Sequence, residues 1–105
     1  MNTEFKSIIE RVREIRKKYA EFEKQQYGRE WTGEELALGY MKDVGDLARL
    51  IQAKEGVRKV DDVDNELGHE LSDCIWSAIV LADKYGIDIE SDFMKTMDEL
   101  DKRLS

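Results

Sequence analysis

The sequence predicts an all-α protein, and three observations favour that fold class. The chain of 105 residues contains no proline, and 39% of its residues are charged while 41% are hydrophobic, a composition that suits amphipathic helices. Apolar residues recur at spacings of three and four, the period of a helix with one buried face. The sequence lacks the sustained alternation that is typical of a half-buried strand. We therefore expect a single domain over residues 1–105 that folds as a four-helix bundle.

The first two helices are expected over Thr3–Tyr27 and Gly33–Lys54. Gly28 ends the first helix, because glycine adopts the left-handed conformation that follows many helix ends. Thr32 and Glu35 have the spacing of a capping box, in which each side chain accepts a hydrogen bond from the other residue's backbone N–H. The apolar stripe of the first helix comprises Phe5, Ile8, Ile9, Val12, Ile15, Tyr19 and Phe22, and that of the second comprises Ala37, Tyr40, Met41, Val44, Leu47, Ala48 and Ile51.

The third and fourth helices are expected over Asp64–Tyr85 and Ile89–Leu104. Gly86 ends the third helix, and Asp88 is a favourable N-cap for the fourth. The stripe of the third helix comprises Leu67, Leu71, Cys74, Ile75, Ala78, Ala82 and Tyr85, and that of the fourth comprises Ile89, Phe93, Met97, Leu100 and Leu104.

The third helix contains an uncharged stretch, Cys74–Ala82, that surrounds the helix rather than following one face. Trp76, Ile79 and Val80 point away from the main stripe, and a helix that is apolar all round is buried all round. We therefore expect a second packing surface in a homo-oligomer, either a homodimer or a dimer of dimers.

Charge and composition exclude several classes of function. With 17 basic and 24 acidic residues the net charge is −7, which argues against a nucleic-acid binder. The single cysteine, Cys74, excludes a disulfide framework and a Cys-based zinc cluster. No apolar run approaches the length of about 20 residues that a membrane span needs, and the N-terminus lacks a signal-peptide core. A soluble cytoplasmic protein is the expectation.

Two pairs of acidic residues are the candidate chemical site. Asp43 and Asp46 lie in the second helix, Glu70 and Asp73 lie in the third, and each pair has the i, i+3 spacing that puts both carboxylates on one face. Asp46 and Glu70 lie about 12 and 9 Å from the connecting loop at 1.5 Å rise per residue. An antiparallel hairpin of these helices would therefore bring the four carboxylates level.

Four adjacent carboxylates repel one another unless a positive charge lies among them. No Lys or Arg occurs between Lys59 and Lys84, and a hard divalent cation such as Mg²⁺, with Mn²⁺ as the alternative, prefers oxygen ligands. The Glu-x-x-His motifs of a di-iron bundle are missing, because His69 directly precedes Glu70. A solvated acidic face has the same spacing, so on the residues alone both interpretations stay open.

At these residues the sequence resembles the MazG-like family of all-α nucleoside triphosphate pyrophosphohydrolases, which includes dCTP pyrophosphatases and dimeric dUTPases. The family signature is EExxE followed, after a variable gap, by ExxD. The stretch ALGYMKDVGDLARLI is similar to the first motif, and HELSDCIWSAIVLADKYGIDIE is similar to the second. The resemblance covers Trp31 to Arg103.

The resemblance implies an enzyme that binds Mg²⁺ and cleaves a nucleoside triphosphate between the α and β phosphorus atoms, giving a monophosphate and pyrophosphate. It implies a house-cleaning role that removes unwanted nucleotides. The metal ligands and catalytic carboxylates that it implies are Asp43, Asp46, Glu70 and Asp73.

The family also places base-contacting aromatic residues ahead of the second helix, and Tyr27 and Trp31 occupy that region. A phosphate-contacting tail motif is matched here at Arg103. Five positions depart from the family pattern. Lys42 replaces the first glutamate, Asp43 and Asp46 replace the other two, and Thr96 and Leu100 stand within the tail motif.

Two other functions are compatible with the residues. The chain could be a non-catalytic helical oligomerisation or regulatory module that kept the fold and lost the activity. It could also be an acidic dimer that binds no metal. Stabilisation by Mg²⁺, and its loss when Asp46 or Glu70 is neutralised, would discriminate among the three.

Overall fold

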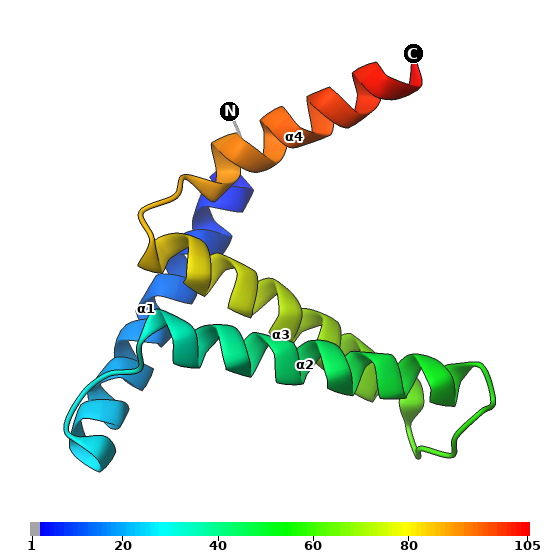
Figure 1. Cartoon of the computed structure of the whole chain (residues 1–105), viewed down its shortest axis with the longest axis horizontal. Helices are drawn as coiled ribbons and strands as arrows, with labels where there is room; N and C mark the ends of the chain where they lie inside the picture. Colours follow the sequence, from blue (N-terminus) through cyan, green and yellow to red (C-terminus); the bar gives the residue numbers. More distant parts are fainter. Residues whose placement is uncertain (1–2) are drawn as a thin grey trace. The chain divides into compact units, whose positions relative to one another are not determined.

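A computed structural model describes residues 3–105 of the chain, and this described part is all-helical, with four helices and no strand. The predicted fold class and the number of helices are therefore confirmed. The first, second and fourth helices have the predicted bounds, whereas the third begins and ends one residue earlier than predicted. The helices, labelled in Figure 1, are α1 (Thr3–Tyr27), α2 (Gly33–Lys54), α3 (Val63–Lys84) and α4 (Ile89–Leu104).

The helix ends follow the local signals in the sequence. Gly28 and Gly86 have positive φ angles of 79° and 67°, a conformation that glycine adopts without steric cost. The Thr32 side chain accepts a hydrogen bond from the Glu35 backbone N–H at 3.2 Å, and the Glu35 carboxylate accepts one from the Thr32 N–H at 2.9 Å. Asp88 caps α4 by accepting from the Ser91 N–H at 3.2 Å. The capping box and both glycine stops are thus confirmed.

The chain forms two compact units. The hairpin unit comprises Trp31–Ala78, which includes α2 and most of α3. The terminal unit comprises Met1–Glu30 and Ile79–Ser105, which include α1, the end of α3 and α4. Each unit is described by itself below.

The terminal unit contains four of the five buried apolar residues of the described chain. Ile9 of α1 and Ile79, Val80 and Ala82 of α3 are between 4% and 8% exposed. The rings of Phe5 and Phe93 meet edge to face with centroids 6.0 Å apart, a favourable aromatic geometry. This unit therefore has an apolar core of its own.

One buried and one exposed ion pair complete the terminal unit. Arg16 donates two hydrogen bonds to the carboxylate of Glu23, at 2.7 and 2.9 Å, and Glu23 is only 4% exposed. Arg13 of α1 donates to Asp83 of α3 at 2.7 Å across 70 positions of sequence. Every acid named here has an arginine as its partner.

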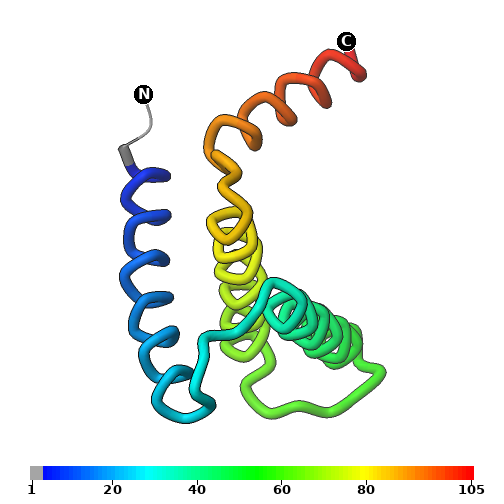
Figure 2. Tube along the Cα trace, turned by 60° about the vertical axis from the view of Figure 1, so that its left-hand side comes forward, coloured from blue at the N-terminus to red at the C-terminus, as the bar shows by residue number. Residues whose placement is uncertain are grey.

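In the hairpin unit α2 and the first part of α3 lie side by side, joined by the loop that Figures 1 and 2 show in green. Lys54 at the end of α2 donates to Asp64 near the start of α3 at 2.6 Å. Leu50 is the most deeply buried apolar side chain, at 1% exposure. The predicted antiparallel hairpin is confirmed.

The predicted apolar stripe of α2 is partly wrong. Met41, Val44 and Ile51 are exposed, whereas Leu50, which lay outside the predicted stripe, is buried. The buried face is rotated because the half-buried Asp43 and Asp46 lie on it next to α3. A hydrophobicity pattern cannot indicate that carboxylates occupy part of the inner face.

The uncharged stretch of α3 is only partly free for a partner. Ile79 and Val80 are buried within the chain itself, so they need no second copy to cover them. On the same helix Leu71 and Ile75 are exposed instead, Ile75 at 60%. Of the described helices, none combines the length and the apolar character needed to cross a membrane.

Candidate metal centre

The four predicted acids meet in the hairpin unit and form what we call the acidic cluster, Asp43, Asp46, Glu70 and Asp73. One carboxylate oxygen each of Asp43, Asp46 and Glu70 lies within 4.8 Å of the others, and the same holds for ligand atoms of His69, Glu70 and Asp73. Glu70 belongs to both groups. The hairpin therefore brings Asp43 and Asp46 of α2 together with Glu70 of α3, whereas Asp73 is grouped only with residues of α3.

Glu70 is the centre of the cluster and the residue with the least satisfied carboxylate. Its Oε2 atom is buried and has no hydrogen-bond partner in the described part of the chain. Burial is the main cause that raises the pKa of Glu70 above its ordinary value, and the neighbouring carboxylates raise it further, whereas His69 lowers it. A buried carboxylate oxygen without a partner is costly, so this atom favours a bound cation.

Asp43 is held in place by a hydroxyl on the facing helix. Ser77 of α3 donates to Asp43 Oδ2 at 3.1 Å, and both side chains are partly buried. A hydrogen bond of this kind fixes the rotamer of a carboxylate while leaving its other oxygen free. Ser77 therefore orients one candidate ligand toward the cluster.

The remaining two acids each have a partner one helical turn away. Lys42 donates to Asp46 Oδ2 at 2.9 Å. His69 Nε2 lies 3.4 Å from Asp73 Oδ2, and its side chain is 69% exposed. Both contacts are on the helix surface, where such pairs are weak and are easily rearranged.

The thiol of Cys74 lies next to the cluster without adding a negative charge to it. Burial raises the pKa of Cys74, and the carboxylates of Asp43, Glu70 and Asp73 raise it further. The neutral thiol is therefore favoured at neutral pH. The cluster has a donor set of hard carboxylate oxygens, with the imidazole of His69 at its edge.

The other predicted site residues are not part of this cluster. Tyr27 and Arg103 are exposed residues of the terminal unit. Trp31 belongs to the hairpin unit, but it precedes α2, whose first residue, Gly33, lies about 15 Å from Asp43 along the helix axis at 1.5 Å per residue. One ligand could contact both Trp31 and Asp43 only if it extended along the helix.

Two members of the site were missed from the sequence. Ser77 lies four residues after Asp73, a spacing that places both on one face of α3 and could have drawn attention to it. Lys42 lies four residues before Asp46, so a lysine of α2 pairs with the cluster, although no Lys or Arg lies between Lys59 and Lys84 around α3. His69 is exposed and lies beside Asp73.

No family model, no curated protein and no solved structure matches this chain. We therefore infer function from the residues and their geometry. They provide two overlapping groups of metal-ligating atoms that share Glu70, and at their junction lies a buried oxygen with no partner in the part of the chain that the structure describes.

Proposed function

We propose that this protein is a MazG-like nucleoside triphosphate pyrophosphohydrolase that depends on Mg²⁺ or Mn²⁺. It would convert an NTP or dNTP and water to the monophosphate and pyrophosphate, in a cytoplasmic house-cleaning role. The observation that carries the proposal is the buried Oε2 of Glu70, which has no hydrogen-bond partner among residues 3–105 and lies where the two candidate ligand groups overlap. The order of the two acidic motifs on paired helices supports it.

The residues fit a hard divalent cation. Asp43, Asp46 and Glu70 offer three carboxylate oxygens within 4.8 Å of one another, and Mg²⁺ and Mn²⁺ prefer oxygen ligands of this kind. The raised pKa of Glu70 indicates that its charge lacks compensation. Asp43, Asp46 and Glu70 are the residues that would hold the ion, which leaves Asp73 beside them to act as a base.

When bound, the ion would neutralise the triphosphate and polarise the phosphorus that water attacks. The chain's own residues then have distinct tasks. Ser77 keeps Asp43 in one orientation through its 3.1 Å hydrogen bond. Glu70 bridges the two halves of the cluster. Asp73, outside the group of three carboxylates, is placed to accept the proton of the attacking water as general base.

The P–O bond that forms in this reaction is matched by the P–O bond that breaks. The oxygen of water forms a new bond to the α phosphorus, and its proton passes to the carboxylate. The bond from that phosphorus to the α–β bridging oxygen breaks, and pyrophosphate leaves. In a protein of net charge −7, the reaction requires positive charge at the site because substrate and protein would otherwise repel each other.

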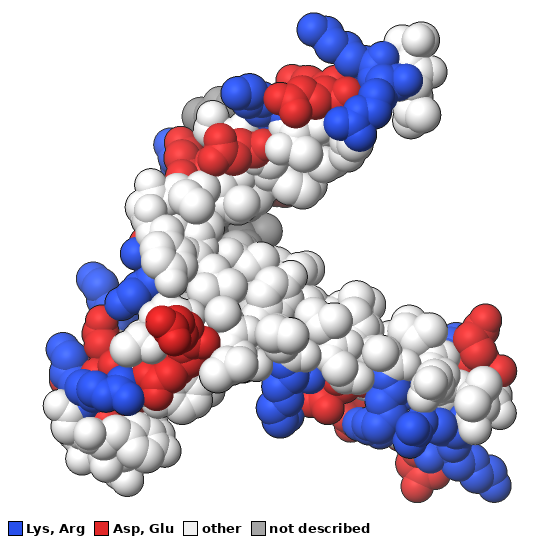
Figure 3. Space-filling model, in the orientation of Figure 1, with Lys and Arg blue, Asp and Glu red and all other residues white. Residues whose placement is uncertain are grey.

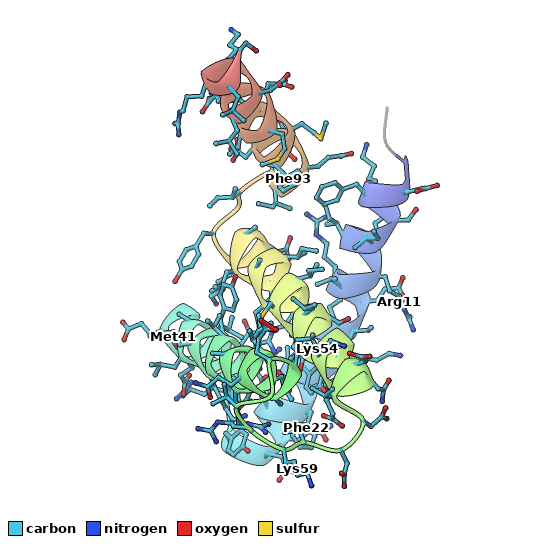
Figure 4. The ribbon with its side chains drawn as sticks, turned by 90° about the vertical axis from the view of Figure 1, so that its right-hand side faces the viewer. Arg11, Phe22, Met41, Lys54, Lys59 and Phe93 are labelled. Carbon is cyan, nitrogen blue, oxygen red and sulfur yellow. The ribbon has the colours of Figure 1, made fainter. Side chains whose placement is uncertain are left out.

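Oligomerisation is part of the proposal and rests on exposed apolar side chains. Leu38 and Met41 of α2 are 66% and 71% exposed, and Ile75 of α3 is 60% exposed. Figure 3 shows a broad uncharged area over α2 and α3, with charged residues gathered along one edge of α2, and Met41 lies on the outer surface of α2 in Figure 4. Apolar surface on this scale is typical of an interface, here between copies in a homodimer or a dimer of dimers.

The test is release of pyrophosphate from a panel of NTPs and dNTPs, with Mg²⁺, with Mn²⁺ and with chelator. Asp46→Asn and Glu70→Gln should each lower turnover about a hundredfold or more, because each removes a ligand. The matched control is Asp64→Asn on the same hairpin, whose carboxylate pairs with Lys54 away from the cluster, and it should keep full activity.

Turnover by the wild type that needs the metal and yields monophosphate plus pyrophosphate would support the proposal and identify the substrate. No turnover with any nucleotide would overturn it in favour of the non-catalytic module. The departures at Lys42, Thr96 and Leu100 would then explain the loss.

A further inference from the structure

Among the lysines that the structure describes, Lys42 has its ammonium group nearest to the acidic cluster. Its Nζ donates to Asp46 Oδ2 at 2.9 Å, and its side chain is 76% exposed while that of Asp46 is 32% exposed. The hydrogen bond to Asp46 is the main cause that raises the pKa of Lys42, and the charges of Asp43 and Glu70 add to it. Lys42 therefore interacts with Asp43 and Glu70 as well as with Asp46.

A divalent ion and this ammonium require the same carboxylate. An ion held by Asp46 would lie a few ångströms from Lys42, so the two positive charges repel each other and compete for one ligand. The ammonium is the one that can leave, because it lies on a flexible four-carbon stem and its exposed i, i+4 pair with Asp46 is weak. Once released, it is a mobile positive charge at the rim of the cluster.

The incoming nucleotide supplies a new partner for that charge. A triphosphate bound at the cluster places its phosphate oxygens beside acidic side chains, and lysine binds phosphate well as a compact point charge. The move from Asp46 to phosphate keeps Lys42 paired in both states. Mg²⁺ and Lys42 together would then offset the charge of the triphosphate.

We propose that Lys42 is a tethered counter-ion, which holds Asp46 when no divalent ion is bound and contacts the phosphates of the nucleotide when the ion takes Asp46. This inference rests on the proposed function, because it assumes that the cluster binds a divalent ion. Lys42 is a phosphate-binding residue in the loaded state and an inhibitor of metal binding in the free state. Removing Lys42 should therefore weaken phosphate binding and strengthen metal binding, whereas removing a mere surface ion pair would change neither affinity.

The experiment measures the two affinities separately by isothermal titration calorimetry at low salt, in wild type, Lys42→Gln and Lys42→Arg. The first titrant is Mn²⁺ or Mg²⁺ alone. The second is the metal complex of inorganic tripolyphosphate, added to protein already saturated with metal. Lys54→Gln is the matched control, because it removes the same charge from the same helix at the loop end of the hairpin, where Lys54 pairs with Asp64 (Figure 4).

Lys42→Gln should bind the metal about three- to tenfold more tightly than wild type, because the competing charge is gone. The same variant should bind the tripolyphosphate complex about tenfold more weakly, because a phosphate contact is lost. Lys42→Arg should keep wild-type values in the metal titration to within about twofold, and Lys54→Gln should do so in both titrations.

Metal affinity in Lys42→Gln that equals or falls below that of wild type would overturn the inference while leaving the proposed function intact. Unchanged tripolyphosphate affinity would overturn it equally, since Lys42 would then be a surface ion pair only. If the wild type binds no divalent ion, the proposed function fails first, and that result is distinguishable because no variant can then differ in metal affinity.

Discussion

Two glutamates, one in each unit, have opposite surroundings, and Glu23 is buried whereas Glu70 is half-buried. In the terminal unit Glu23 accepts hydrogen bonds from Arg16 at 2.7 and 2.9 Å through both of its oxygens. In the hairpin unit Glu70 has a buried Oε2 without a hydrogen-bond partner among the described residues, and three aspartates around it. The same side chain is thus neutralised internally in one unit and left uncompensated in the other.

The difference teaches how to tell a structural acid from a binding one. A buried carboxylate that serves the fold carries its own cation, since an unpaired buried charge would cost more than the fold gains. A carboxylate that serves a ligand is left uncompensated, and its cost is offset only when the ligand arrives. Glu23 fits the first description, and under the proposed function Glu70 fits the second.

The largest expected effect comes from breaking the structural pair. Arg16→Ala should lower the free energy of unfolding by about 3 kcal/mol, because Glu23 would stay buried without its partner. Urea denaturation in the presence of chelator measures it. Arg11→Ala is the control, since its pair with Glu14 is exposed on both sides, and it should cost less than about 0.5 kcal/mol. Equal losses in the two variants would show that Glu23 does not depend on Arg16.

An intermediate effect is expected from Ser77, the hydroxyl that orients Asp43. Ser77→Ala should weaken Mg²⁺ binding about tenfold, because an unrestrained ligand must be ordered when the ion binds. Ser72→Ala is the control, since its hydroxyl bonds to the Gly68 carbonyl within α3. Calorimetric titration with Mg²⁺ measures both variants, and an unchanged affinity in Ser77→Ala would contradict the assigned role.

The smallest expected effect is a change of stability with pH that is caused by the carboxyl group of Glu70. Below its ordinary pKa of 4.5 the carboxyl is neutral in both states and carries no penalty. As the pH rises through the raised pKa of the folded state, the folded protein must hold an uncompensated charge, so stability is lost.

In chelator, the wild type should therefore lose stability relative to Glu70→Gln as the pH rises above that ordinary value. Urea denaturation over a pH series measures the difference between the two proteins, and Mg²⁺ should abolish it. If the free energies of unfolding of the two proteins differ by the same amount at every pH, Glu70 does not carry an uncompensated charge.

The fold could be predicted closely because its signals are local. The glycines that end α1 and α3, the capping box at Thr32 and the N-cap at Asp88 act over three or four residues, and they fix the helix bounds. The rotation of α2 could not be predicted in the same way. It depends on which side chains of α3 meet it, so Met41 was expected inside and lies outside.

The acids of the candidate site could also be predicted, because their spacing and their height on a hairpin follow from helix geometry. Their partners could not. The contact of Ser77 with Asp43 spans 34 positions, and that of Arg13 with Asp83 spans 70, so neither follows from local periodicity. In the sequence Lys42 stands out only as a departure from a motif, although its spacing of four residues from Asp46 already indicates an ion pair.

The most direct test of a metal centre at Glu70 is the free energy of unfolding measured against Mg²⁺ concentration, in wild type and Glu70→Gln. The wild type should gain stability with the logarithm of Mg²⁺ concentration, by about 2.7 kcal/mol at a hundred times the dissociation constant, while Glu70→Gln should not respond. The metal centre would be contradicted if the stability of the wild type does not change with Mg²⁺ concentration and Glu70→Gln is more stable than the wild type at every concentration.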